Sequence, residues 1–238
     1  MSKQIHSLIS GTEQLPRYHA KQVRQDGKQY YLDSRGIRLP SVTTILNATK
    51  PQADRDALFQ WRQRVGQVAA NQIAGAASRR GTGTHKQIQR FLEGEAFSGS
   101  TAILPYWQSI EPVLQDVQDV RLVEGSVFHY DLGYAGRVDA VASFRGVPCL
   151  CEWKTADKPK GSVERLYDYP LQMVAYCGAI NQYYREQGVK LEHALLVVAI
   201  PGKPAEVFWF EPVAMQVYWQ QWQQRVAAFS QRRSYCSS

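Results

Sequence analysis

Asp139, Glu152 and Lys154, in the middle of the chain, have side chains that could bind a metal ion and activate water. Glu152 and Lys154 lie two residues apart in the sequence VPCLCEWKT, which is otherwise mostly apolar. Successive side chains of a strand point to opposite faces, so Glu152 and Lys154 share one face. A carboxylate and an ammonium group are costly to bury unless they are paired or bind a metal. We therefore expect these charged groups to have a function on this strand.

Asp139 precedes Glu152 by thirteen residues. A hairpin turn at 144–147 would bring Asp139 opposite Glu152 on the neighbouring strand. Two carboxylates at one position suit Mg²⁺ or Mn²⁺, which can polarise a phosphate and lower the pKa of a bound water. Lys154 could hold the attacking water and offset the negative charge that develops on the phosphate. The three residues predict hydrolysis of phosphodiester bonds, and the alternative is an ion-pair network on a solvated sheet face.

The elements that would position these residues change in kind along the chain. Residues 1–26 are polar without a period and are expected to form a flexible arm, which leaves 27–238 as a single domain. Residues 27–118 are expected to be mainly helical, with Ser41 as N-cap of one helix and a further helix at 54–68. Gly81 and Gly83 are expected to interrupt the next helix, so that Thr82 or Thr84 caps a new helix with His85 in its first turn.

The second half of the chain, 119–238, is expected to contain a sheet and its closing helices. The runs VRLVEGSVFHYD, GYAGRVDAVASFRG and VPCLCEWKTAD are rich in β-branched and aromatic residues and are separated by Gly and Asp, which is typical of an antiparallel meander. A helix at 169–187 follows, then a buried strand at 193–200, a partner strand with the sequence AEVFWFE, and a closing helix at 212–233.

Two further motifs accompany the Gly136-x-x-Asp139 and Glu152-x-Lys154 pattern, which resembles the PD-(D/E)XK nuclease superfamily with its αβββαβ core. Gln172 and Tyr176, four residues apart on one helical face, resemble the Q-x-x-x-Y motif of the RecB-like branch. The sequence GTGTH, which ends at His85, resembles the G-x-x-x-H element of that branch. The resemblance implies an α/β fold whose mixed central sheet is flanked by helices and preceded by a helical extension. It implies the catalytic residues Asp139, Glu152, Lys154, Gln172 and Tyr176, and the metal ligands His85, Asp139 and Glu152.

The sequence PSVTTIL at 40–46, followed by a helix with Trp61 and Arg62, is similar to the start of the mitochondrial genome maintenance exonuclease family and its bacterial and phage relatives. This resemblance covers about 30–179. It implies a metal-dependent DNA exonuclease that acts on single-stranded ends in replication, repair or recombination. Two alternatives stay open: a structure-specific or restriction-type endonuclease, and a non-catalytic nucleic-acid-binding protein on the same fold.

The formal charge of +7 and the pI of about 9.2 favour an anionic partner such as DNA. Basic residues surround His85 and follow Lys154, and we expect phosphate contacts from Arg79, Arg80, Lys86, Arg90, Lys158, Lys160 and Arg165. Glu124 is either an additional acid near the metal or an exposed carboxylate at a strand start. We expect a monomer.

The four Cys residues do not have the spacing of metal ligands, and we expect reduced packing residues rather than an iron–sulfur cluster. The start of the sequence does not resemble a signal or transit peptide, and no apolar stretch approaches the roughly twenty residues that cross a bilayer. These features predict a cytoplasmic protein of bacterial or phage origin that has no membrane partner.

Overall fold

The computed structural model describes residues 13–235, and the expected flexible arm at 1–26 therefore lies partly outside the described residues. Its later part is not loose, because residues 21–25 form the first strand of a small antiparallel sheet. This sheet has the order β1-β2-β3. A larger sheet of five strands has the order β4-β5-β6-β7-β8. The bounds of the strands are β1 Lys21–Gln25, β2 Lys28–Leu32, β3 Arg38–Pro40, β4 Val117–His129, β5 Tyr134–Phe144, β6 Val147–Thr155, β7 His193–Ala199 and β8 Glu206–Phe210.

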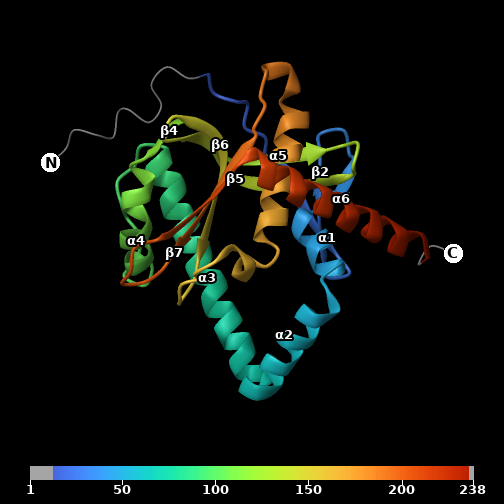
Figure 1. Ribbon diagram of the computed structural model, residues 1–238, viewed down its shortest axis with the longest axis horizontal. Coiled ribbons are helices and arrows are strands. Elements are labelled where there is room, and N and C mark those ends of the chain that lie inside the picture. Colours follow the sequence, from blue (N-terminus) through green and yellow to red (C-terminus); the bar gives the residue numbers. More distant parts are fainter. Residues whose placement is uncertain (1–12, 236–238) are drawn as a thin grey trace.

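The large sheet is mixed, as expected. β4, β5 and β6 form an antiparallel meander, β6 pairs parallel with β7, and β7 pairs antiparallel with β8. Helices flank both of its faces (Figure 1). Their bounds are α1 Val42–Ala48, α2 Gln52–Val65, α3 Gln67–Leu92, α4 Leu104–Leu114, α5 Tyr169–Tyr183 and α6 Pro212–Tyr235, with short 3-10 turns at Val163–Leu166 and Arg185–Gln187.

The alternation of side chains in the strands divides the core into two layers. Cys149, Cys151 and Trp153 of β6 pack with residues of α3 and α4 on one face of the sheet. Leu150, on the opposite face of β6, packs with residues of α1, α5 and α6. Trp153 is 2% exposed, and burial of one such side chain contributes about 1.5–3 kcal/mol. The predicted fold class, an α/β fold whose mixed central sheet is flanked by helices and preceded by a helical extension, is confirmed.

The start of α1 agrees with its sequence signal, because the N–H of Thr44 donates to Ser41 Oγ over 3.0 Å. The helix expected at 54–68 is α2, which ends at Val65, and the helix expected at 169–187 ends at Tyr183. α2 has no buried residue, and with the first half of α3 it forms a V-shaped projection (Figure 1). Among the described residues, no helix is long and apolar enough to cross a membrane.

The expected helix break at Gly81 and Gly83 was wrong, because α3 continues without interruption from Gln67 to Leu92. A Cβ atom at Gly83 would lie 2.9 Å from Ile103 Cγ2. The absent side chain therefore allows α3 to approach the residue before α4 closely. Thr84 is buried inside the helix rather than at a cap, and His85 lies in the helix interior rather than in a first turn.

Candidate active site

Three carboxylates lie in one row across β4, β5 and β6, and we call Glu124, Asp139 and Glu152 the acid row. The pairs Val123↔Ala140 and Gly125↔Val138 place Glu124 opposite Asp139. The N–H of Asp139 donates to Glu152 Oε1 over 3.3 Å, one residue beyond the last β5–β6 pair. Like charges in directly opposed positions repel each other, so the row favours a bound cation.

Asp139 also holds the end of the β5–β6 ladder. Its Oδ2 accepts a hydrogen bond of 2.8 Å from the N–H of Trp153, and the side chain thus replaces a main-chain acceptor where the two strands separate. Its other oxygen, Oδ1, lies 3.1 Å from His85 Nδ1. These two contacts fix the orientation of the Asp139 carboxylate, which is 8% exposed, before any ligand binds.

His85 reaches the acid row from α3, which covers the β4–β6 part of the sheet (Figure 1). Ligand atoms of His85, Glu124 and Asp139 all lie within 4.8 Å of one another. The structure thus groups Glu124, rather than the expected Glu152, with His85 and Asp139. Glu124 is 8% exposed, so it is not an exposed carboxylate at a strand start. Carboxylate oxygens and an imidazole nitrogen are donors that fit Mg²⁺ or Mn²⁺.

Glu152 is instead paired with Lys154. Lys154 Nζ donates to Glu152 Oε2 over 2.9 Å, and the two side chains are 16% and 2% exposed. Burial and the charge of Asp139 raise the pKa of Glu152 to about 7, although Lys154 acts in the opposite direction. Burial would lower the pKa of Lys154, but Glu152 and Asp139 outweigh it and the pKa is raised. Lys154 therefore stays charged at neutral pH, whereas Glu152 can take up a proton there.

The pKa values of the other titratable residues in the site also depend on burial and on neighbouring charges. Burial alone would raise the pKa of Asp139, but His85 and Lys154 lower it below its ordinary value. Asp139 in turn raises the pKa of His85 against the effect of burial. Burial and Asp139 raise the pKa of Glu124, although Arg137 Nε forms an ion pair of 2.8 Å with its Oε2. The Asp139 carboxylate therefore remains ionised most readily among the three acids.

Gln172 and Tyr176 come from α5, on the opposite face of the sheet from α3. Gln172 Nε2 donates to the Tyr176 hydroxyl over 3.1 Å. The Tyr176 ring packs on Gly136, where an added Cβ would lie 2.3 Å from Tyr176 Cε1. Burial and the charge of Glu152 raise the pKa of Tyr176 well above its ordinary value, so its hydroxyl keeps its proton. The structure brings this pair next to the acid row.

Tyr31 of β2 is a further aromatic residue beside the acids that our sequence analysis missed. It is 5% exposed and packs with Phe128 and Ala135. Burial raises the pKa of Tyr31, and the charges of Glu124 and Glu152 act in the same direction. No motif marks Tyr31, because it comes from the small sheet, which reaches the site through tertiary contacts such as the bridge between Ser41 and Ala135.

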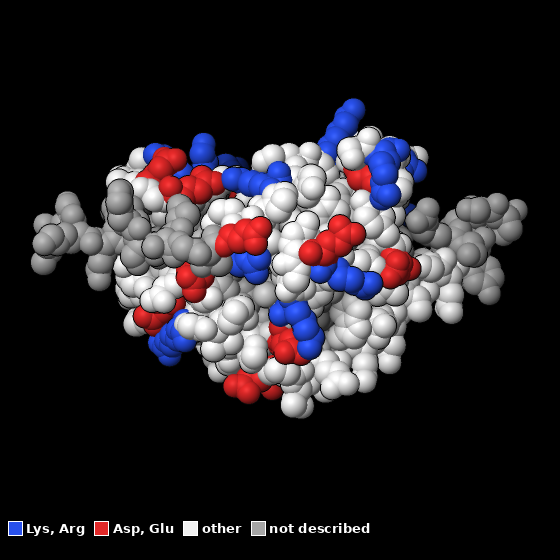
Figure 2. All heavy atoms as spheres, turned by 90° about the horizontal axis from the view of Figure 1, so that it is seen from above, with Lys and Arg blue, Asp and Glu red and all other residues white. Residues whose placement is uncertain are grey.

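The basic residues predicted to contact phosphates fall into two groups. Arg79, Arg80, Lys86 and Arg90 line a pocket of about 670 Å³ along α3. Arg80 is held by Asp157 at 3.2 Å and Arg90 by Glu95 at 2.6 Å. Lys158, Lys160 and Arg165 lie in the segment between β6 and α5. Lys or Arg and Asp or Glu alternate on the face shown in Figure 2, which therefore has no continuous basic surface.

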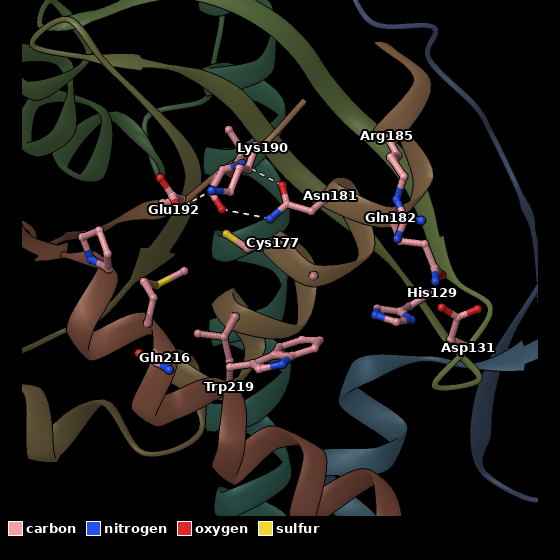
Figure 3. Close-up of a pocket in the computed structure, with 15 residues that line it drawn as sticks. His129, Asp131, Cys177, Asn181, Gln182, Arg185, Lys190, Glu192, Gln216 and Trp219 are labelled. Atoms are coloured by element: carbon pink, nitrogen blue, oxygen red, sulfur yellow. Dashed lines mark hydrogen bonds and ion pairs between the residues drawn. The ribbon is translucent and has the colours of Figure 1, made fainter. Parts of the chain in front are cut away.

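Another pocket, of about 570 Å³, is lined by Cys177 and Asn181 of α5 and by Gln216 and Trp219 of α6 (Figure 3). The helical period places Gln172 and Tyr176 on the other side of α5. Trp219 stacks on His129 there, with ring centroids 5.8 Å apart. Asn181 is occupied by hydrogen bonds to both main-chain groups of Leu191. None of the predicted site residues lines this pocket. Among the described residues, the metal-ligand group lies at the acid row instead.

The element order, the acid row and the adjacent lysine have the arrangement of the PD-(D/E)XK class that the sequence resembles. No family model matches the chain. Mitochondrial genome maintenance exonuclease 1 of Mus musculus is 30% identical over 208 residues, which cover 84% of this chain and 61% of the relative. Its counterpart in Xenopus tropicalis is 32% identical over 206 residues, which cover 82% of this chain and 58% of the relative. The chain is related to this exonuclease family and spans about three fifths of the length of these relatives.

Among solved structures, the chain is similar to a candidate exonuclease of Eubacterium rectale. The TM-score is 0.44 at 13% sequence identity, and the match covers 64% of this chain and 65% of the other.

Proposed function

We propose that the protein is a DNA exonuclease that depends on Mg²⁺ or Mn²⁺. The observation that supports this most directly is the grouping of His85, Glu124 and Asp139 within 4.8 Å, beside a buried pair of Glu152 and Lys154. A set of oxygen and nitrogen donors next to a charged lysine is suited to metal-assisted hydrolysis of a phosphodiester. The relatives named as exonucleases support the same reaction class.

Each residue has a role in this proposal. His85, Glu124 and Asp139 would hold the cation, and Glu152 would join them or bind through water. A divalent cation in this place would lower the pKa of water and offset negative charge on the phosphate. Lys154 orients the attacking water and neutralises charge on the phosphate oxygens. A cation in this place would lower the pKa of Glu152, and the Glu152 carboxylate could then accept the proton that this water loses.

Gln172 and Tyr176 have a positioning role. Their hydrogen bond of 3.1 Å leaves the second N–H of the Gln172 amide to contact a phosphate oxygen or water. We further propose single-stranded DNA ends as substrate, a role in DNA replication, repair or recombination, and DNA contacts from Arg79, Lys86 and the other predicted basic residues. The monomeric state, the single domain at 27–238 and the cytoplasmic location expected from the sequence stay predictions.

Cleavage of four labelled DNA substrates tests the proposal. Linear single strands, circular single strands and the two corresponding duplexes are incubated with Mn²⁺ and, in parallel, with EDTA. We expect linear single strands to shorten with Mn²⁺ only and circles to stay intact, because an exonuclease needs an end. Asp139→Asn should reduce the rate at least about 100-fold, whereas Asp131→Asn, a change of an exposed acid, should not. Cleavage of circles would indicate an endonuclease instead, and binding without any cleavage would indicate a non-catalytic protein.

A further inference from the structure

The segment of residues 15–20 lies along β4, the edge strand of the large sheet, and is fixed there by main-chain contacts. The N–H of Leu15 donates to the carbonyl of Arg121, and the N–H of Ser126 donates to the carbonyl of Tyr18, both over 2.9 Å. The N–H of Ala20 donates to Ser126 Oγ over 3.1 Å. These bonds hold the side chains of the segment at a defined place beside the acid row.

Arg17 connects this segment to the end of α3, because its Nη1 forms an ion pair of 2.7 Å with Glu93. A pocket of about 400 Å³ lies between the segment and α3. Glu124 and His85, two of the three grouped metal-ligand residues, line it together with Arg137. The pocket therefore adjoins the Glu124 end of the acid row.

The charges in this pocket are mainly positive. Its lining includes the three cations Arg17, Lys86 and Arg137 and the imidazole of His19. Among the described residues, Lys86 has no ion-pair partner. Arg137 is paired with Glu124 in the metal-free protein at 2.8 Å. If Glu124 bound a metal cation, the cation would replace Arg137 as the partner of the Glu124 carboxylate. The guanidinium of Arg137 would then be able to bind an anion.

A different pocket adjoins the Glu152 end of the row. It has a volume of about 470 Å³ and is lined by Lys154 and Gln172, with Lys50 and Tyr169. A DNA strand that enters on this side and crosses the acid row would reach the pocket of Arg17, Lys86 and Arg137. Arg17 and His19 of the segment of residues 15–20 line that pocket on the side away from α3, and the end of the strand would lie against them.

We propose that the pocket of Arg17, Lys86 and Arg137 binds the phosphomonoester at the end of a DNA strand. The inference rests on the proposed function and adds a preference for one kind of strand end. An internal phosphodiester carries one negative charge, whereas a phosphate monoester carries about −1.5 to −2 at pH 7. Lys86 and Arg137, with Arg17 beside them in its pair with Glu93, suit the monoester better than the singly charged diester. The same phosphate chemistry occurs at a 5′ end and at a 3′ end, and the experiment separates the two.

Binding is measured by fluorescence anisotropy with Ca²⁺ in place of Mg²⁺, on internally labelled single strands that carry a phosphate at the 5′ end, at the 3′ end or at neither. We expect a phosphate at one of the two ends to increase the affinity about 10- to 100-fold. In Arg17→Gln/Lys86→Gln this preference should fall below about threefold. Lys158→Gln is the control, because it should weaken all three strands alike and keep the preference.

Equal affinity of the wild-type protein for all three strands would overturn the proposed phosphate site. A preference for a phosphorylated end that survives in Arg17→Gln/Lys86→Gln would overturn it as well. The single change Lys86→Gln, on the exposed side of α3, is measured as well so that the test does not depend on the folding of the double variant. Since binding in Ca²⁺ requires no cleavage, the two proposals fail separately. A clear end preference without cleavage would reject the nuclease, and cleavage without any preference would reject the pocket.

Discussion

Glu124 and Asp139 face each other across β4 and β5, and His85 lies within 4.8 Å of both through its ligand atoms. This relationship depends on an irregularity in β4. Between the pairs Gln118↔Ser143 and Leu122↔Val141, β4 advances four residues while β5 advances two. Without this shift Leu122 would face Asp139, and the acid at the Glu124 end of the row would be lost.

The first prediction concerns the role of Glu124 as a ligand. Glu124→Gln removes one carboxylate charge from the group and should weaken Mn²⁺ binding at least about tenfold. Isothermal titration calorimetry on the two proteins measures the change without reference to cleavage. Glu186→Gln, a change of an exposed acid far from the row in sequence, should leave the affinity unaltered. If Glu124→Gln bound Mn²⁺ as tightly as the wild-type protein, Glu124 would not be a ligand. The metal ligands would then be those expected from the sequence, His85, Asp139 and Glu152.

The second prediction separates chemistry from binding at Lys154. Lys154→Ala removes the ammonium that pairs with Glu152 at 2.9 Å and should lower the cleavage rate at least about 100-fold. The affinity for DNA in Ca²⁺ should stay within about threefold, because the proposed phosphate contacts of the other basic residues remain. Single-turnover cleavage and anisotropy give the two quantities. Lys158→Ala should show the opposite pattern, with weaker binding and little loss of rate at saturation. If Lys154→Ala cleaved DNA at the wild-type rate, Lys154 would not orient the attacking water.

The third prediction is the pH dependence of metal binding. Glu152 has a pKa of about 7, raised by burial, and the pKa of His85 is also raised. His85 binds a metal only when it is deprotonated, and the Glu152 carboxylate beside the site attracts a cation only in its ionised form, so protons compete more strongly as the pH falls. Mn²⁺ affinity should therefore drop about tenfold between about pH 8 and about pH 6. Calorimetry in two buffers of different ionisation enthalpy should detect proton release near pH 6. An affinity that does not vary with pH, without proton release, would contradict the ionisation states derived from the structure.

The fourth prediction tests the approach of Tyr176 to β5. In Gly136→Ala the new Cβ would lie 2.3 Å from Tyr176 Cε1, so the ring must move. We expect a loss of about 1–3 kcal/mol in the free energy of unfolding, because such overpacking displaces buried groups. Gly81→Ala is the control, since its Cβ would meet only Thr155 Oγ1 at 3.8 Å. Alanine is the better helix former, and this variant should gain up to about 1 kcal/mol in urea denaturation. Equal stability of both variants would show that the ring is loosely held.

Much of the sheet could be predicted from the sequence because its physical cause is local. Alternation in VPCLCEWKT placed Glu152 and Lys154 on one face, and the turn at Arg145 and Gly146, both with positive φ, closes the hairpin that follows Asp139. The features that could not be predicted depend on distant contacts. Gly83 lies inside α3, where a side chain would meet Ile103, and the position of Glu124 depends on the shifted register of β4. Tyr31 is brought to the site by a separate sheet.

The central claim is that the acid row and His85 hold a divalent cation, and anomalous scattering from a crystal grown with Mn²⁺ tests it most directly. We predict an anomalous peak about 2.1 Å from a carboxylate oxygen of Asp139, with His85 and Glu124 as further ligands. A protein saturated with Mn²⁺ that shows no peak there, or a peak only elsewhere, would contradict the proposed metal site and the reaction derived from it.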